Sequence, residues 1–257
     1  MSNIYLVTGA NRGIGRGIVE KLLLRPDTTV IAGVRYPSDP TSASLRELPA
    51  AGGSRIVVLQ LRETTDYAAI LPTLESAGIA YIDVVVANAG SSGGLAQSLL
   101  ETDPEVVVED CAVNAALPLR LFQSTWPLLE ASLSTRSART LPVATRFIYI
   151  SSTMGSIATL DEETMPVGLS YSMSKAAANY FAKKASVEFK DKGLVVGILH
   201  PGWVKTDMGQ TLADSLGIKE PPTTLDESTR LCLEQIDGWN LEKTGKFLNN
   251  VGKELPW

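Results

Sequence analysis

The chain has 257 residues and a mass of 27.5 kDa, enough for one large α/β domain or two small ones. Its net charge of -5 and pI near 5.1 exclude the strongly basic surface that binding to nucleic acid or anionic membranes requires. Two distant cysteines, no signal-peptide pattern and no apolar run of bilayer length argue against disulfide scaffolds and membrane proteins, so we expect a cytoplasmic protein.

Short β-branched runs alternate with helical stretches along the chain. In chain order, the predicted elements are a strand at 3–8, a helix at 14–24, a strand at 29–34, a short helix, a strand at 55–61, a helix at 67–77, a strand at 83–87, a long helix at 104–132, a strand at 147–151, a helix at 172–190, a strand at 194–199 and a last short strand at 246–248. This order is typical of a doubly wound parallel sheet, here of about seven strands, with helices on both faces. Without an internal linker or repeat, the sequence predicts one Rossmann-fold domain over residues 1–257.

Three polar segments are too long to be tight connections: 133–146, 153–169 and 205–229. The last two follow the fifth and sixth strands, at the sheet edge where such folds bind ligands. We therefore predict that 153–169 and 205–229 are substrate loops. Four large side chains in or beside these segments are candidates for a hydrophobic pocket, with ordinary packing as the alternative: Met154, Met165, Trp203 and Met208.

Gly9, Gly13 and Gly15 come directly after the first strand and open the first helix. Glycine there permits a tight turn and lets the backbone approach a pyrophosphate that faces the helix N-terminus. The segment therefore predicts a dinucleotide site, with glycines that serve only a turn as the alternative.

The residue after the second strand bears on the choice of coenzyme. An acidic residue there commonly selects NAD by binding the ribose 2′-hydroxyl. This chain has Arg35 instead, and Arg12 lies within the glycine loop. Guanidinium groups bind a 2′-phosphate through charge-assisted, bidentate bonds, so we predict NADP(H). A solvated Arg35 is the alternative.

Tyr171 and Lys175 are four residues apart on a predicted helix and therefore share one face. A phenol with a pKa of about 10 is a poor acid–base catalyst at neutral pH. A cation about 4 Å away, at an effective dielectric of about 20, favours the phenolate by up to about 4 kcal/mol, or about three pKa units. We therefore expect Lys175 to lower the pKa of Tyr171. Ser152 closes the fifth strand, where it can donate to a substrate carbonyl.

Asn114 lies inside the long helix, where asparagine is mildly unfavourable, so a polar task is expected there, with a solvated side chain as the alternative. The motifs together occur in the order typical of short-chain dehydrogenases/reductases: TGANRGIG at 8–15, Asn88-Ala89-Gly90, Asn114, Ser152, Tyr171-x-x-x-Lys175 and Pro201-Gly202. The chain resembles that family over essentially its whole length. The segments PGWVKTDM and GKFLNN…ELPW are similar to its carbonyl-reductase-like branch.

The resemblance implies an NADPH-dependent oxidoreductase that reduces a ketone or aldehyde. Tyr171 would donate a proton, Ser152 would hold the carbonyl oxygen, and Lys175 would bind the nicotinamide ribose. Asn114 would position a water that links Lys175 to solvent. The implied coenzyme-binding residues are Gly9, Asn11, Arg12, Gly13, Ile14, Gly15, Arg35, Leu61, Arg62, Asn88, Ala89, Gly90, Tyr171, Lys175, Pro201, Gly202, Val204 and Thr206.

Arg62 departs from the family pattern, which has an aspartate there that helps to place the adenine. Either backbone groups hold the adenine, or Arg62 reaches over it or toward the phosphate. His200, Cys111 and Cys232 are interpreted as packing residues, and no metal site is expected.

Two other functions stay open: a dinucleotide-binding sensor or interaction protein, and alcohol oxidation as the physiological direction. The expected partner is a small hydrophobic or aromatic carbonyl compound, with no nucleic acid and no membrane. The resemblance also implies a homodimer or homotetramer, formed through the helices that hold Asn114 and Tyr171.

Overall fold

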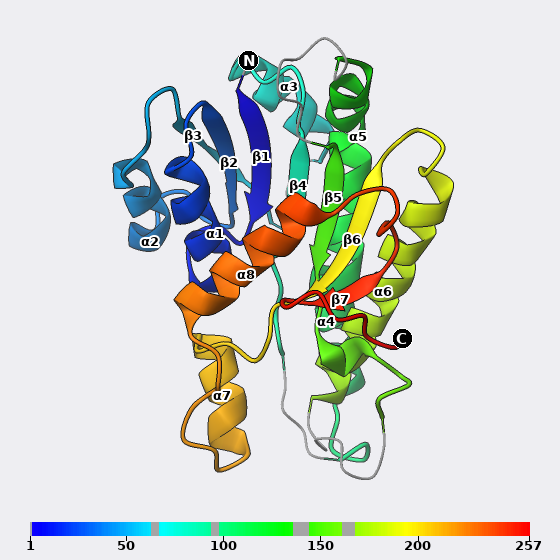
Figure 1. Cartoon of the computed structure of the whole chain (residues 1–257). Helices are drawn as coiled ribbons and strands as arrows, with labels where there is room; N and C mark the ends of the chain where they lie inside the picture. The colour runs from blue at the N-terminus through cyan, green and yellow to red at the C-terminus, as the bar shows by residue number, and fades with distance from the viewer. Residues whose placement is uncertain (1, 63–66, 94–97, 136–143, 161–167) are drawn as a thin grey trace.

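The computed structural model describes residues 2–62, 67–93, 98–135, 144–160 and 168–257. Over these residues one parallel sheet has the strand order β3-β2-β1-β4-β5-β6-β7 (Figure 1). Its strands are β1 (Asn3–Thr8), β2 (Thr28–Val34), β3 (Arg55–Gln60), β4 (Val84–Ala87), β5 (Arg146–Ile150), β6 (Val195–His200) and β7 (Phe247–Asn249). The strand order reverses between β1 and β4, so their carboxyl ends flank the point where such sheets bind ligands. The predicted sheet of about seven strands is confirmed.

Helices cover both faces of the sheet, as predicted. Helices α1 and α8 lie on one face, and α3, α5 and α6 lie on the other (Figure 1). The α-helices are α1 (Gly13–Leu23), α2 (Pro40–Ala43), α3 (Ile70–Ser76), α4 (Pro104–Cys111), α5 (Leu117–Thr135), α6 (Leu169–Glu188), α7 (Asp207–Ser215) and α8 (Leu225–Gly238). The other helical turns are η1 (Ser44–Glu47), η2 (Tyr67–Ala69), η5 (Thr153–Gly155) and a π-helical segment, η3 (Ala112–Ala116), between α4 and α5.

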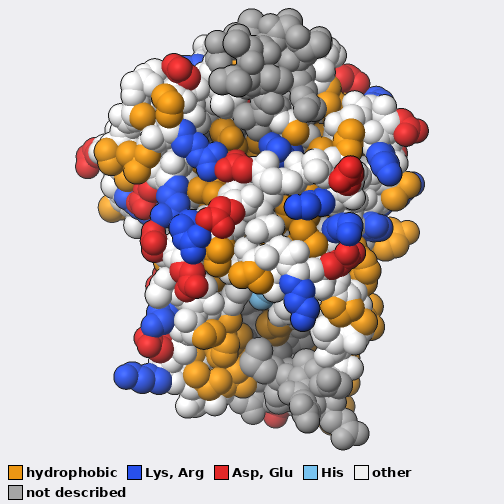
Figure 2. Space-filling view, viewed as in Figure 1, with side chains coloured by type: hydrophobic (Ala, Val, Ile, Leu, Met, Phe, Trp, Pro, Cys, Tyr) orange, Lys and Arg blue, Asp and Glu red, His pale blue; other side chains and the backbone are white. Residues whose placement is uncertain are grey.

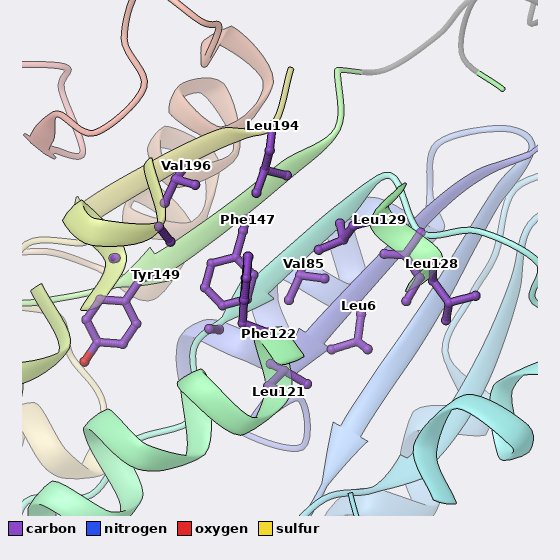
Figure 3. Close-up of a cluster of buried hydrophobic side chains, with 14 of the residues drawn as sticks. Leu6, Val85, Leu121, Phe122, Leu128, Leu129, Phe147, Tyr149, Leu194 and Val196 are labelled. Carbon is purple, nitrogen blue, oxygen red and sulfur yellow. The ribbon is translucent and has the colours of Figure 1, made fainter. Parts of the chain in front are cut away.

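Two hydrophobic cores result from the alternation of side chains along the strands. On β1, Tyr5 and Val7 face α1 and α8, whereas Ile4 and Leu6 face α3, α5 and α6. Figure 3 shows the second core, in which Phe122 of α5 packs edge-on against Phe147 of β5 with ring centroids 5.2 Å apart. Burying each such side chain contributes about 1.5–3 kcal/mol, so both cores hold the sheet rigidly behind its carboxyl edge.

The prediction of a loop over 205–229 is wrong for much of that segment, because α7 and the first turn of α8 lie within it. Each helix begins at a threonine whose hydroxyl accepts a backbone N–H from its first turn. Thr206 accepts from Gly209 at 3.1 Å, and Thr224 accepts from Glu227 at 3.2 Å. These caps make a helix favourable in a segment whose polarity suggests a loop.

The face in Figure 2 shows basic and acidic side chains intermingled, with a hollow below the carboxyl edge of the sheet, beside α7. Among the helices in the described ranges, none is both long and apolar enough to cross a bilayer.

The close packing of β6 on the loop after α8 gives a test of the fold. A Cβ added at Gly197 would lie 2.7 Å from Cε2 of Trp239 and 2.8 Å from Cδ1 of Ile148. We expect Gly197→Ala to lower the free energy of unfolding by about 1–3 kcal/mol, measured by urea denaturation. Gly52→Ala is the matched control, because its Cβ would meet open space. Equal stability of the two variants would contradict this packing.

Candidate active site

The glycine loop between β1 and α1 has the shape of an anion site. Gly9 and Gly13 have φ of 64° and 53°, a left-handed conformation that other residues rarely adopt. A Cβ on Gly15 would overlap the carbonyl of Gly9. Arg12, the N-cap residue of α1, makes no side-chain capping bond, and the first turn of the helix has no acidic residue, so its first N–H groups can receive a phosphate. Ile14 packs from that turn against the core beneath α1.

The ends of β1 and β4 are tied together beside this loop. The hydroxyl of Thr8 accepts the N–H groups of Asn88 and Ala89 at 3.0 and 2.9 Å, and the Asn88 amide donates to the Thr8 carbonyl at 2.9 Å. A Cβ on Gly90 would lie 3.0 Å from Oδ1 of Asn114 and 3.6 Å from Nζ of Lys175. The tripeptide therefore runs from the glycine loop to the predicted catalytic residues.

The side chains at the ends of β2 and β3 lie close together. Arg35 is exposed, and its carbonyl accepts from the Gln60 amide at 3.1 Å. The guanidinium of Arg62 lies 5.8 Å from the centroid of the Tyr36 ring, within range of a cation–π contact. Leu61 bonds the carbonyl of Val34 through its N–H at 2.8 Å. Arg62 therefore lies beside Tyr36, the residue that follows Arg35 in the chain.

Arg12 and Asn11 point to two different neighbours. Nη1 of Arg12 lies 3.9 Å from Oδ2 of Asp207 at the start of α7, and both side chains are largely exposed. The Asn11 amide donates to Oγ1 of Thr41 at 3.0 Å. An exposed ion pair of this length contributes little stability, so Arg12 can exchange Asp207 for another anion.

Tyr171 and Lys175 lie on α6 and converge with the end of β5. Nζ of Lys175 lies 5.4 Å from the centroid of the Tyr171 ring and donates to the Ile150 carbonyl at 2.9 Å. Ser152 hydrogen-bonds the Tyr171 side chain. The sequence-predicted Ser152, Tyr171 and Lys175 therefore form one cluster at the carboxyl edge of the sheet.

Burial dominates the protonation of this cluster. It raises the pKa of Tyr171 to about 12, although the hydrogen bond from Ser152 acts in the opposite direction. It lowers the pKa of Lys175 to about 7. In the chain alone, the net pKa of Tyr171 therefore lies above its ordinary value, while the effect of Lys175 on it stays a prediction. The lysine is partly neutral near pH 7 and directs its ammonium to the Ile150 carbonyl.

Asn114 lies in the π-helical segment and is fully buried, so the alternative of a solvated side chain is wrong. Its Nδ2 donates to the Ser91 carbonyl and to Oγ of Ser174, both at 2.8 Å, and its Oδ1 accepts the Ser91 N–H at 2.9 Å. These bonds tie the chain after β4 to α6. Such π-helical turns are frequent at functional sites.

The backbone carbonyl of Asn114 has an unusual partner. Pro118, four residues later, has no N–H to donate to it. The hydroxyl of Tyr149 on β5 donates to this carbonyl at 3.1 Å, and the Tyr149 ring lies 4.8 Å below Nζ of Lys175. Tyr149 therefore supports both Asn114 and Lys175. The sequence offers only its place three residues before Ser152 as a signal.

The exit of β6 is held from two sides. The Pro201 carbonyl accepts from Oγ of Ser228 at 2.8 Å and from the Asn250 amide at 3.0 Å. Gly202 has a φ of 90°, and Val204 forms a bridge with Thr223. Ser228 and Asn250, which sequence reasoning missed, fix the segment predicted to frame the nicotinamide.

The predicted pocket residues are only partly brought together. Met154 lies in η5, directly after Ser152, whereas Met208 is partly exposed on α7. Nε1 of Trp203 donates to the Gly209 carbonyl at 3.1 Å, which fixes its ring against α7. Met165 lies outside the described residues.

His200 does more than pack at the end of β6. Its Nδ1 accepts the N–H of Thr153 at 3.3 Å, and burial lowers its pKa to about 4. The neutral imidazole therefore links β6 to the residue after Ser152. His200 is the last residue of β6, at the edge where such sheets bind ligands, and this position is the signal in the sequence that could have indicated its role.

Comparison with known proteins agrees with this geometry. The family model described as short chain dehydrogenase matches residues 3–217. A norsolorinic acid ketoreductase of Dothistroma septosporum is 40% identical, over 98% of this chain and 92% of that protein.

Two solved structures are also similar. The carbonyl reductase Sniffer of Drosophila melanogaster has a TM-score of 0.85 and 25% identity, over 100% of both chains. An NADPH-bound carbonyl reductase from chicken fatty liver has a TM-score of 0.83 and 31% identity, over 100% of this chain and 99% of that one. The predicted resemblance to the carbonyl-reductase-like branch is confirmed. This chain belongs to the short-chain dehydrogenase/reductase family of oxidoreductases.

Proposed function

We propose that the protein is an NADPH-dependent ketoreductase or carbonyl reductase that converts a ketone or aldehyde into an alcohol. The observation that carries this proposal is the convergence of Ser152, Tyr171 and Lys175 beside Gly90, whose tripeptide is hydrogen-bonded to Thr8 at the start of the glycine loop. When bound, NADP(H) supplies the hydride for the carbonyl carbon. The chain itself must hold the carbonyl oxygen and deliver a proton.

Tyr171 is the proposed proton donor. In the chain alone its pKa is raised to about 12, so the phenol carries the proton that reduction requires, but efficient transfer needs that pKa to be brought closer to working pH in the loaded site. The Ser152 hydroxyl, which bonds Tyr171, can donate to the same substrate oxygen.

Lys175 is proposed to bind the nicotinamide ribose through its ammonium, with Asn114 connecting it to solvent. The Ile150 carbonyl and the Tyr149 ring hold the ammonium in place. The other proposed coenzyme contacts follow the glycine loop, the 88–90 tripeptide and the segment from Pro201 to Thr206.

NADP(H) is the proposed coenzyme because basic side chains occupy the place of an acidic one after β2. Arg35 is exposed there, and Arg62 lies beside the neighbouring Tyr36 ring. The similar carbonyl reductase from chicken fatty liver binds NADPH. We propose that Arg35 binds the 2′-phosphate, helped by Arg12 once it releases Asp207, and that Arg62 and Tyr36 flank the adenine.

We propose a hydrophobic or aromatic carbonyl compound as the substrate. The relative from Dothistroma septosporum is named for a ketone substrate, norsolorinic acid. Met154 and Trp203 lie beside Ser152 and Gly202 in the chain and are the proposed pocket residues, together with Met208 and Met165. The protein is further proposed to act in the cytoplasm, since Cys111 and Cys232 are free thiols.

We also propose a homodimer or homotetramer. Helix α6 exposes Met173, Tyr180 and Val187 at seven-residue intervals, with Tyr180 77% exposed. An apolar stripe of this spacing on one helix face suits packing against a second copy.

Tyr171→Phe removes the proton donor and preserves the ring. We expect its turnover of a carbonyl substrate to fall about a thousandfold, while NADPH binding, followed by nucleotide fluorescence, stays nearly unchanged. Tyr180→Phe, the same change on the exposed face of α6, is the control and should retain full turnover. More than a tenth of the original activity in Tyr171→Phe would contradict the proposed role.

Arg35→Ala tests the choice of coenzyme. Loss of a charge-assisted bond to the 2′-phosphate should raise the KM for NADPH by about 10- to 100-fold and leave the KM for NADH unchanged. Arg46→Ala, which changes an exposed arginine of η1, is the control. If the unaltered protein prefers NADH, the assignment of Arg35 is wrong.

Tyr180→Glu places a charge in the centre of the apolar stripe. We expect it to shift the protein to a smaller assembly in sedimentation-velocity experiments, because a carboxylate is costly to bury at an interface. An unaltered protein that sediments as a monomer would rule out the proposed oligomer.

A further inference from the structure

Asp110 is a buried carboxylate that belongs to none of the predicted catalytic positions. It is 1% exposed, on the last turn of α4. Its Oδ1 accepts the Ser91 hydroxyl at 2.8 Å, and both of its oxygens accept the Gly93 N–H at 3.0 Å. In each contact the carboxylate is the acceptor, which is the role of the anion.

Asp110 and Asn114 both hydrogen-bond the segment that follows β4. They are four residues apart and therefore lie on one side of the helix. Asn114 binds the backbone of Ser91 in both directions, while Asp110 binds the Ser91 side chain and the Gly93 backbone. A Cβ on Gly93 would lie 2.9 Å from Cγ1 of Val106, so this segment lies tightly against α4.

Asp110 lies on the last turn of α4, and α4 packs directly against α6, the helix of Tyr171 and Lys175. The negative charge of Asp110 raises the pKa of both Lys175 and Tyr171, against the burial that lowers the pKa of the lysine. The bond from Asn114 to Ser174, next to Lys175, fixes the two helices together.

Two tyrosine rings lie near the ammonium of Lys175: that of Tyr171 on α6, 5.4 Å from Nζ, and that of Tyr149 on β5, 4.8 Å from it. His200 ends β6, and Cys111 follows Asp110 on α4. Burial keeps Tyr149 and His200 neutral, since it raises the pKa of the phenol and lowers that of the imidazole. Burial and the neighbouring Asp110 also raise the pKa of the Cys111 thiol.

We propose that Asp110 is a positioning residue for the reaction: it holds the 91–93 segment beside the site and gives Lys175 a fixed anionic neighbour that keeps its ammonium protonated. Its effect on catalysis rests on the proposed function, whereas its effect on the charge of Lys175 does not. The proposal predicts the direction in which the protonation of Lys175 changes. Removing the negative charge of Asp110 destabilises the ammonium, so Lys175 loses its proton at a lower pH.

The test follows Lys175 directly. In protein labelled with carbon-13 at the lysine ε position, the Lys175 resonance, assigned by its loss in Lys175→Met, is titrated in the unaltered chain and in Asp110→Asn. We expect its titration midpoint to fall by about one pH unit in Asp110→Asn. Ser91→Ala, which removes a hydrogen bond but keeps the carboxylate, should leave the midpoint unchanged. If Asp110→Asn does not fold, Asp110→Ser carries the same test, because its hydroxyl can still accept the Gly93 N–H.

An unchanged Lys175 midpoint in a folded Asp110 variant would overturn the proposal, and so would an equal shift in Ser91→Ala. The kinetic readout is the pH profile of kcat/KM for carbonyl reduction, whose alkaline limb should move to lower pH by the same amount. A shifted resonance in a protein that reduces no carbonyl compound would uphold the electrostatic role and reject the proposed function.

Discussion

The site depends on keeping one ammonium group, that of Lys175, inside the protein. The Ile150 carbonyl accepts from it at 2.9 Å, and the faces of Tyr149 and Tyr171 lie 4.8 and 5.4 Å away. Burial brings the pKa of this lysine to about 7, so modest changes in its surroundings decide whether it is charged. Phe181 of α6 packs edge-on against Phe147 of β5 with ring centroids 6.0 Å apart, so the packing that stabilises the fold also places Lys175 beside the Ile150 carbonyl.

The π-helical segment between α4 and α5 also helps to hold the Lys175 ammonium in place. Pro118 leaves the Asn114 carbonyl without its usual helical donor, and Tyr149 supplies one from the sheet. The Asn114 side chain meanwhile reaches Ser174 on α6. Because Pro118 has no N–H, the Asn114 carbonyl instead accepts the Tyr149 hydroxyl from the sheet, and the Tyr149 ring also lies against Lys175.

The sequence predicts the sheet well because β-branched runs and intervening amphipathic stretches are local signals. It also predicts the convergence of Ser152 and the Tyr171–Lys175 pair, since the carboxyl ends of parallel strands meet at one edge. Helices α7 and α8 were missed where polar composition outweighed the capping signals at Thr206 and Thr224. The net rise in the pKa of Tyr171 could not be predicted from the sequence, because its largest cause is burial, a property of the whole fold. Asp110 could not be distinguished from a solvated helix carboxylate, and only the packing of α4 on α6 reveals its place.

The most direct test of the account is the consumption of NADPH with a panel of aromatic and aliphatic ketones, aldehydes and quinones, with the alcohol product identified. We expect at least one hydrophobic carbonyl compound to be reduced, with one alcohol formed for each NADPH oxidised. A protein that binds NADPH tightly and reduces no member of the panel would contradict it, and would leave a dinucleotide-binding protein without this catalysis.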